Sequence, residues 1–82
     1  MFHTVESVKP LENYRLYVVF EGGEKRVYDV NPLFDRWEEF QSLKNIYGLF
    51  ELVKVDLGGY GISWNDEIDL ACDELYYNGE PV

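Results

Sequence analysis

The chain has 82 residues and a mass of 9.7 kDa, which suffices for one small domain over residues 1–82 and leaves no room for a second core. Seven Lys and Arg residues against 16 Asp and Glu residues give a formal net charge of −9. A chain of this charge would be repelled by phosphate, so we expect no direct nucleic-acid binding. Hydrophobic residues make up 46% of the chain and aromatic residues 17%, which excludes a disordered acidic tail.

Two further features of the sequence indicate a cytoplasmic protein that makes no membrane contact. Apolar runs stay well short of the roughly 20 residues that a membrane-spanning helix needs, and the first residues do not resemble a signal peptide. The single cysteine, Cys72, can form no internal disulfide, which is consistent with a reducing compartment. We expect Cys72 to pack in the core, because free cysteine is among the most buried residue types.

The first third of the chain predicts an antiparallel hairpin preceded by another strand. Strand-like runs at 14–20 and 24–30 flank a pair of glycines, a pattern typical of a β-hairpin. Residues 4–9 are a weaker strand candidate that should end at Pro10, since proline lacks the amide hydrogen for a strand ladder. The valines of that strand are three residues apart, which predicts either a bulge or a strand that is only partly buried on both faces.

The segment after Val30 predicts the main helix of the domain. Asn31 is placed to cap it, Pro32 suits its first turn, and apolar residues recur at three- and four-residue spacing as far as residue 44. A break inside this helix is the alternative that the pattern leaves open. The expected buried stripe comprises Leu33, Trp37 and Phe40, with Phe34 and Leu43 as further candidates.

The last third predicts a second hairpin and a short closing helix. Apolar side chains alternate at 53–57 and 60–64 on either side of a glycine turn. Gly61 lies inside the return strand, where we expect a bulge rather than a close approach by another group. Asp69 should cap a helix over 70–76 that stops at the following asparagine and glycine. The predicted fold class is α+β: antiparallel hairpins with a central helix and a short C-terminal helix, in the order ββ(β)αββα.

The sequence does not favour an enzyme, a metal site or a cofactor site. Acyl transfer needs a nucleophile beside an oriented base, and the chain offers one histidine, His3. Five carboxylates within residues 66–74 carry oxygen ligands that suit a hard cation, but the run lacks the central glycine of a calcium loop. We interpret the run as solvated charge and helix capping. Binding of a divalent cation or a small molecule by 66–74 stays an alternative.

Aromatic residues near the acidic run favour a noncatalytic protein-interaction module. Tyrosine and tryptophan anchor protein interfaces, and an acidic surface suits a small basic protein partner. The alternative is a homo-oligomer in which Tyr60, Trp64 and Tyr76 form a self-complementary patch. The candidate interface residues are Tyr60, Trp64, Asp66, Glu67, Asp69, Asp73 and Tyr76.

The end of the chain carries a family resemblance. Residues 61–70, with the sequence GISWNDEIDL, are followed by DELY at 73–76, and together they resemble the bacterial domain-of-unknown-function family 2442. Asp66 and Glu67 stand where members commonly carry an asparagine-glycine turn. The resemblance implies a small ββαββα unit and an accessory or binding role, because the family has no established activity. Some members are encoded in arrangements that resemble toxin and antitoxin pairs, which implies an antitoxin-like form of that role. The residues that best mark the resemblance are Trp64, Asp69, Leu70, Leu75 and Tyr76.

Overall fold

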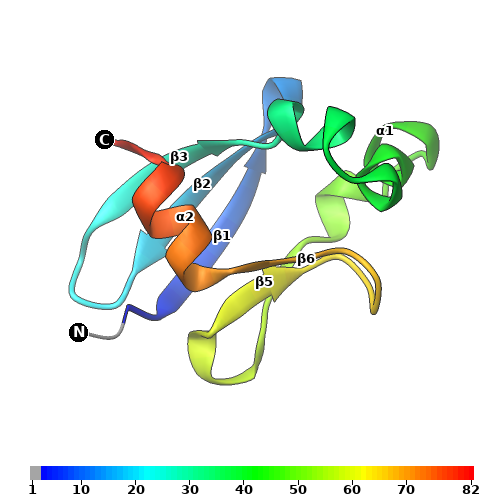
Figure 1. Cartoon of the computed structure of the whole chain (residues 1–82). Helices are drawn as coiled ribbons and strands as arrows, with labels where there is room; N and C mark the ends of the chain where they lie inside the picture. The colour runs from blue at the N-terminus through cyan, green and yellow to red at the C-terminus, as the bar shows by residue number, and fades with distance from the viewer. Residues whose placement is uncertain (1–2) are drawn as a thin grey trace.

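A computed structural model describes residues 3–82, which form two antiparallel sheets and two short helices around one core (Figure 1). The first sheet has the strand order β1-β2-β3-β7, and its strands span Val5–Leu11, Arg15–Phe20, Lys25–Asp29 and Glu80–Pro81. The second sheet has the order β4-β5-β6, with strands at Lys54–Val55, Gly61–Ser63 and Asp69–Ala71. The helices are α1 (Ser42–Asn45) and α2 (Cys72–Asn78). The predicted α+β class is confirmed.

The first hairpin forms as predicted, and β1 adds to its outer side. Leu16 pairs with Tyr28 across β2 and β3, and alternate residues of β2 point into the core. The predicted bulge in β1 is confirmed by a shift of register between Val5 and Ser7. The prediction that β1 ends at Pro10 is wrong, because Pro10 still pairs with Leu16. β1 is the edge strand of its sheet, where a residue without an amide hydrogen is tolerated.

The segment after Val30 does not form one continuous helix, and the break that the sequence left open as an alternative is present. Two 3₁₀ turns, Asn31–Asp35 and Glu38–Gln41, precede the four residues of α1. Trp37 separates the turns with an extended backbone (φ −132°, ψ 122°) and is 43% exposed instead of buried. The side chain of Gln41 donates a 2.6 Å hydrogen bond to the carbonyl of Phe34, a group that a continuous helix would bond internally.

Asn31 does not cap a helix in this structure. Its side-chain amide donates to the backbone carbonyl of Asn13 (2.8 Å) and to Oδ1 of Asp29 (2.8 Å), and its backbone N–H also donates to Asp29 Oδ1 (3.0 Å). The Asn31 side chain therefore links the end of β3 to the turn between β1 and β2. The other apolar residues predicted for the buried stripe do reach the core: Leu33, Phe34, Phe40 and Leu43.

The second hairpin is confirmed in outline, but the closing helix starts later than predicted. β4 and β5 pair around a turn at Leu57–Gly59, and Leu57 and Tyr60 are exposed at its tip. Asp69 lies in β6 and makes no capping bond, so its predicted capping role is wrong. The alternation of buried Ile68 and Leu70 with exposed neighbours is the period-two pattern of a strand. The predicted stop is confirmed, since the N–H of Gly79 donates to the carbonyl of Leu75 (3.1 Å).

Gly61 marks a close approach between strands rather than the expected bulge. The β5 to β6 register is regular through Gly61 and Ala71. A Cβ atom built on Gly61 would lie 2.6 Å from the backbone oxygen of Leu70. Only glycine fits there without moving β6.

The two sheets and α2 share one core. Figure 1 shows α2 lying across the face of the first sheet, and Leu75 from this helix is fully buried. Cys72 is buried as predicted, and its thiol donates to the backbone carbonyl of His3 (3.0 Å). Burial raises the pKa of the Cys72 thiol. Within residues 3–82, neither helix has the length and hydrophobicity that crossing a membrane requires.

Candidate functional site

A groove of about 350 Å³ lies between β6 and the turns that replace the predicted central helix. One wall comes from the segment around Trp37, and the other comes from the loop before β6, β6 itself and the first part of α2. Figure 1 shows β6, in orange, running between β5, in yellow, and the green turns. We call this site the acidic groove, and its lining residues are Trp37, Glu39, Phe40, Glu67, Asp69, Leu70, Ala71 and Glu74.

Four carboxylates line the acidic groove, and within residues 3–82 none of them forms an ion pair. The ion pair found among residues 3–82 joins Arg26 to Glu24, away from the groove. Glu39, Glu67 and Asp69 are exposed, and their side chains make no hydrogen bond within the described part of the chain. The groove therefore presents uncompensated negative charge to a ligand.

The fourth carboxylate, Glu74, is held in place by two donors. The hydroxyl of Tyr28 donates to Oε2 of Glu74 at 2.6 Å, and Nδ2 of Asn78 donates to Oε1 at 2.9 Å. Burial of Tyr28 and its bond to Glu74 raise the pKa of the phenol well above its ordinary value. The bond joins β3 to α2 at the groove and fixes the orientation of this carboxylate.

We expect Tyr28→Phe to lower the free energy of unfolding at neutral pH by about 1–2 kcal/mol, because Glu74 loses a charge-assisted donor. The native pKa of Tyr28 is raised, so its contribution is fully present below the unfolded tyrosine pKa near 10 and declines above it. Stability of the wild type should fall more steeply above about pH 10 than that of Tyr28→Phe. Urea unfolding at neutral and alkaline pH measures both quantities. Tyr17→Phe on the neighbouring strand is the control, and an equal loss in both variants would contradict the prediction.

Trp37 gives the groove an aromatic face. Its ring is half exposed because the extended backbone at this position interrupts the helical turns. The indole packs beside Phe40, with 5.7 Å between ring centroids, and the guanidinium carbon of Arg36 lies 5.0 Å from the Trp37 centroid. Tryptophan is the best aromatic platform for a cation, and here the ring already attracts one.

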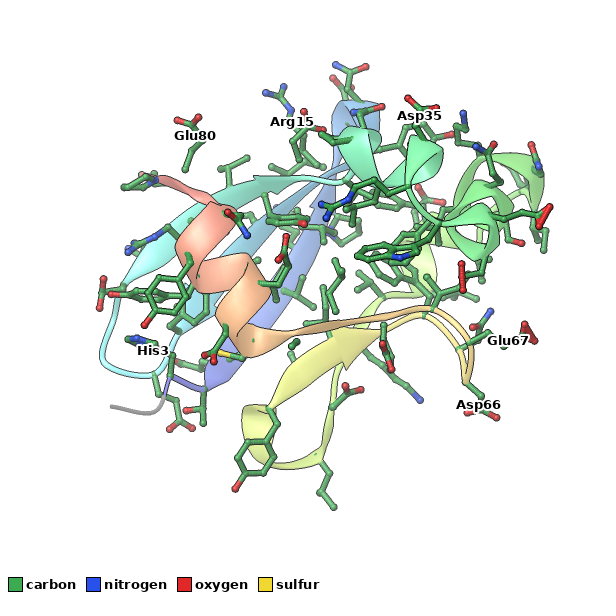
Figure 2. All side chains as sticks on the ribbon, viewed as in Figure 1. His3, Arg15, Asp35, Asp66, Glu67 and Glu80 are labelled. Atoms are coloured by element: carbon green, nitrogen blue, oxygen red, sulfur yellow. The ribbon has the colours of Figure 1, made fainter. Side chains whose placement is uncertain are left out.

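The structure brings two of the seven predicted interface residues into the acidic groove, Glu67 and Asp69. Figure 2 shows Asp66 beside Glu67 at the far end of the loop between β5 and β6. Oδ1 of Asn65 accepts the N–H groups of Glu67 (2.9 Å) and Ile68 (2.9 Å), which shapes this turn. Asp73 is exposed on the first turn of α2 and does not line the groove.

The three aromatic residues expected at the interface lie in different parts of the fold. Trp64 is 5% exposed, and its indole N–H donates to the carbonyl of Phe50 (2.9 Å), so it packs in the core instead of anchoring a partner. Tyr60 is exposed at the tip of the second hairpin, outside the groove. Because Trp64 is buried, Tyr60, Trp64 and Tyr76 form no common exposed patch for self-association.

Tyr76 is enclosed by neighbours on both sides. The imidazole of His3 stacks on its ring at 3.6 Å, and the guanidinium carbon of Arg26 lies 4.4 Å from the ring centroid. The Tyr76 hydroxyl donates to Glu24, at 2.9 Å to Oε1 and 2.8 Å to Oε2. Figure 2 shows His3 beneath α2. The bond to Tyr76 lowers the pKa of Glu24 and raises that of Tyr76. These contacts make Tyr76 a structural link between α2 and the first hairpin.

The groove also contains residues that the sequence did not indicate as interface. Trp37 was assigned to a buried helical stripe, and Glu39 was not among the candidate interface residues. No sequence signal places this segment opposite β6, because the break at Trp37 sets its direction. Among residues 3–82 there is no group of three or more His, Cys, Asp or Glu side chains arranged to hold a metal ion.

Comparison with known proteins identifies a family but no individual relative. The family model described as "Protein of unknown function (DUF2442)" matches residues 5–81, nearly the whole chain. No curated protein and no solved structure matches the chain. The match includes both walls of the acidic groove.

Proposed function

Because the chain belongs to the family of proteins of unknown function DUF2442, whose description names no activity, we propose a function from the groove itself. The protein is a noncatalytic interaction module that binds a small basic protein through the acidic groove. The observation that carries this proposal is the half-exposed face of Trp37 among carboxylates that have no charged partner.

Interface physics supports a basic partner. Tryptophan is enriched among the residues that dominate binding energy, and a desolvated cation over its ring is worth about 2 kcal/mol. The net charge of −9 adds long-range attraction that raises the association rate for a positively charged protein. The described lining residues include no His, Cys, Ser or Lys, so the groove does not offer the usual nucleophile and base of acyl transfer, which supports a binding role.

The finer form of the proposal is an antitoxin-like subunit in the cytoplasm. In this form the acidic groove covers a functional basic surface of the partner and blocks it. The single buried cysteine, which needs no oxidising compartment, supports the cytoplasmic setting. Co-expression tests this form: the protein should restore growth of cells that express the basic partner, and failure to protect them would contradict it.

Removing charge from the groove is expected to abolish partner binding. We would combine Glu39→Gln, Glu67→Gln and Asp69→Asn, and measure recovery of the basic partner in affinity purification from the native host at low salt. The matched control combines Glu6→Gln, Glu12→Gln and Glu80→Gln, which removes the same charge from exposed sites outside the groove. We expect the groove variant to lose the partner and the control to retain it. Equal retention or equal loss by the two variants would contradict a specific role for the groove.

A further inference from the structure

Strand β6 is an edge strand, and its free edge forms one side of the acidic groove. The second sheet has the order β4-β5-β6, so within residues 3–82 β6 pairs with β5 alone. Asp69, Leu70 and Ala71, which are the whole of β6, line the groove. Unpaired backbone groups on a sheet edge are a template for another strand.

The register shows which backbone groups face the groove. Trp64 N–H donates to the Ile68 carbonyl, and Cys72 N–H donates to the Tyr60 carbonyl, both at 2.9 Å. Hydrogen-bonded and non-hydrogen-bonded residue pairs alternate along an antiparallel ladder. Ile62 and Leu70 lie midway between the two pairs just named, so they also form a hydrogen-bonded pair.

The residues of β6 on either side of Leu70 therefore direct their backbone groups away from β5. Asp69 pairs with Ser63, and Ala71 pairs with Gly61, as non-bonded pairs. The Ala71 carbonyl begins the hydrogen bonding of α2, since Ala71 is the N-cap residue. The remaining outward groups are the N–H and carbonyl of Asp69 and the N–H of Ala71. No hydrogen bond of these three groups occurs within the described part of the chain outside the strand ladders.

We propose that the acidic groove binds an extended basic segment of the partner, which adds to the sheet as a strand beside β6. This inference rests on the proposed function and specifies how the partner is held. The backbone of the segment bonds to the outward groups of Asp69 and Ala71, while a lysine or arginine side chain reaches Trp37 and the carboxylates. Backbone bonds supply affinity in this mode of recognition, and side-chain pockets supply specificity.

Charge and hydrogen bonding favour an extended basic segment over other occupants. A helix bonds its backbone groups internally, so it would leave the edge of β6 unpaired. The groove volume of about 350 Å³ lies at the lower end of the range for ligand sites, which suits a side chain and the adjoining backbone. An acidic or neutral strand would meet the carboxylates of Glu39, Glu67 and Asp69 without compensating charge.

In the free protein the guanidinium of Arg36 lies against the Trp37 ring, although Arg36 is not one of the residues that line the groove. Its guanidinium carbon lies 5.0 Å from the Trp37 ring centroid, and Arg36 is exposed. A basic segment bound beside Trp37 is repelled by the charge of this side chain. Arg36→Gln should therefore tighten binding of a basic segment by about threefold, because it removes one repulsive charge.

Ala71→Pro tests the strand addition with little disturbance of the fold. Ala71 has φ −71° and ψ 152°, which proline adopts without strain, and its N–H does not bond to β5. The proline ring replaces the outward N–H and blocks the edge. Ala71→Ser is the control because it keeps the N–H at the same exposed position.

The probe is a blocked peptide of alternating arginine and valine, about seven residues long, so that one face of the strand is basic. Calorimetric titration into the full chain gives its dissociation constant. We expect Ala71→Pro to weaken binding about tenfold or more, the equivalent of one hydrogen bond, and Ala71→Ser to bind like the wild type. NMR should show the Asp69 and Ala71 amides shifting and gaining protection from exchange when the peptide binds.

The outcomes separate this inference from the proposed function. Strand addition would be overturned if a folded Ala71→Pro variant bound the peptide as tightly as the wild type does. It would also be overturned if the Asp69 and Ala71 amides did not change on binding. Either result would stand even where the combined charge variant of the groove still abolishes partner binding. Loss of peptide affinity in both Ala71→Pro and the groove charge variant supports it. Equal peptide binding by the wild type and the groove charge variant would overturn both the strand addition and the proposed function.

Discussion

Trp64→Ala is expected to lower the free energy of unfolding by about 3–5 kcal/mol, a large share of the stability of a small domain. The ring is 5% exposed and packs against Phe40 and Phe50, with centroid separations of 6.1 and 6.0 Å. Truncation would leave a cavity and would also free the carbonyl of Phe50 from its indole donor. Urea denaturation followed by circular dichroism measures the change.

Trp37→Ala is the matched control for Trp64→Ala. Both replace an indole, but the Trp37 ring is 43% exposed and its loss should cost about 1 kcal/mol. The two tryptophans thus separate a stabilising ring from a binding ring. An unchanged unfolding midpoint in Trp64→Ala would mean that the Trp64 ring is exposed, and that the core is packed differently from the structure described above.

Gly61→Ala is expected to destabilise the protein by about 2–3 kcal/mol, because the added methyl group meets backbone and not a movable side chain. The new Cβ would lie 2.6 Å from the oxygen of Leu70 and 3.4 Å from Cα of Ala71. Relief requires β6 to move away from β5, which would disturb one wall of the acidic groove. Thermal unfolding measures the loss of stability, and peptide titration measures the effect on the groove.

Gly22→Ala provides the comparison for Gly61→Ala. Gly22 has φ +98° and no atom within 4 Å of the added Cβ, so it isolates the cost of a left-handed conformation, about 1–2 kcal/mol. At Gly61 the glycine is needed for space, whereas at Gly22 it is needed for the backbone angle. A Gly61→Ala protein as stable as the wild type would show that β5 and β6 are not held at this separation.

Local patterns in the sequence predicted the hairpins because neighbouring residues determine them. Alternation in 14–20 and the paired glycines that follow define β2, its turn and β3 without reference to the rest of the chain. The prediction of a continuous central helix was wrong because apolar spacing of three and four residues fits successive 3₁₀ turns as well as an α-helix. The extended backbone at Trp37 depends on packing of the surrounding core, which a local pattern does not contain.

The candidate site could be predicted only in part, for a related reason. Glu67 and Asp69 stood out in the sequence because they lie in a dense acidic run. Trp37 and Glu39 belong to a distant segment that meets this run only after the chain folds. Assigning Asp69 as a helix cap also concealed β6, since an acidic residue before a helix and an acidic residue on an edge strand look alike in sequence. The free edge of the sheet became visible only with the strand order.

Because the two indoles have different surroundings, the protein has two intrinsic fluorophores that report different events. Trp64, buried in an aromatic cluster, should emit at short wavelength and report the folded state. Trp37, which is half exposed beside a guanidinium group, should emit at longer wavelength and be accessible to soluble quenchers. A ligand in the acidic groove would shield Trp37 while leaving Trp64 unchanged. Unlabelled protein can therefore signal occupancy and unfolding in one spectrum.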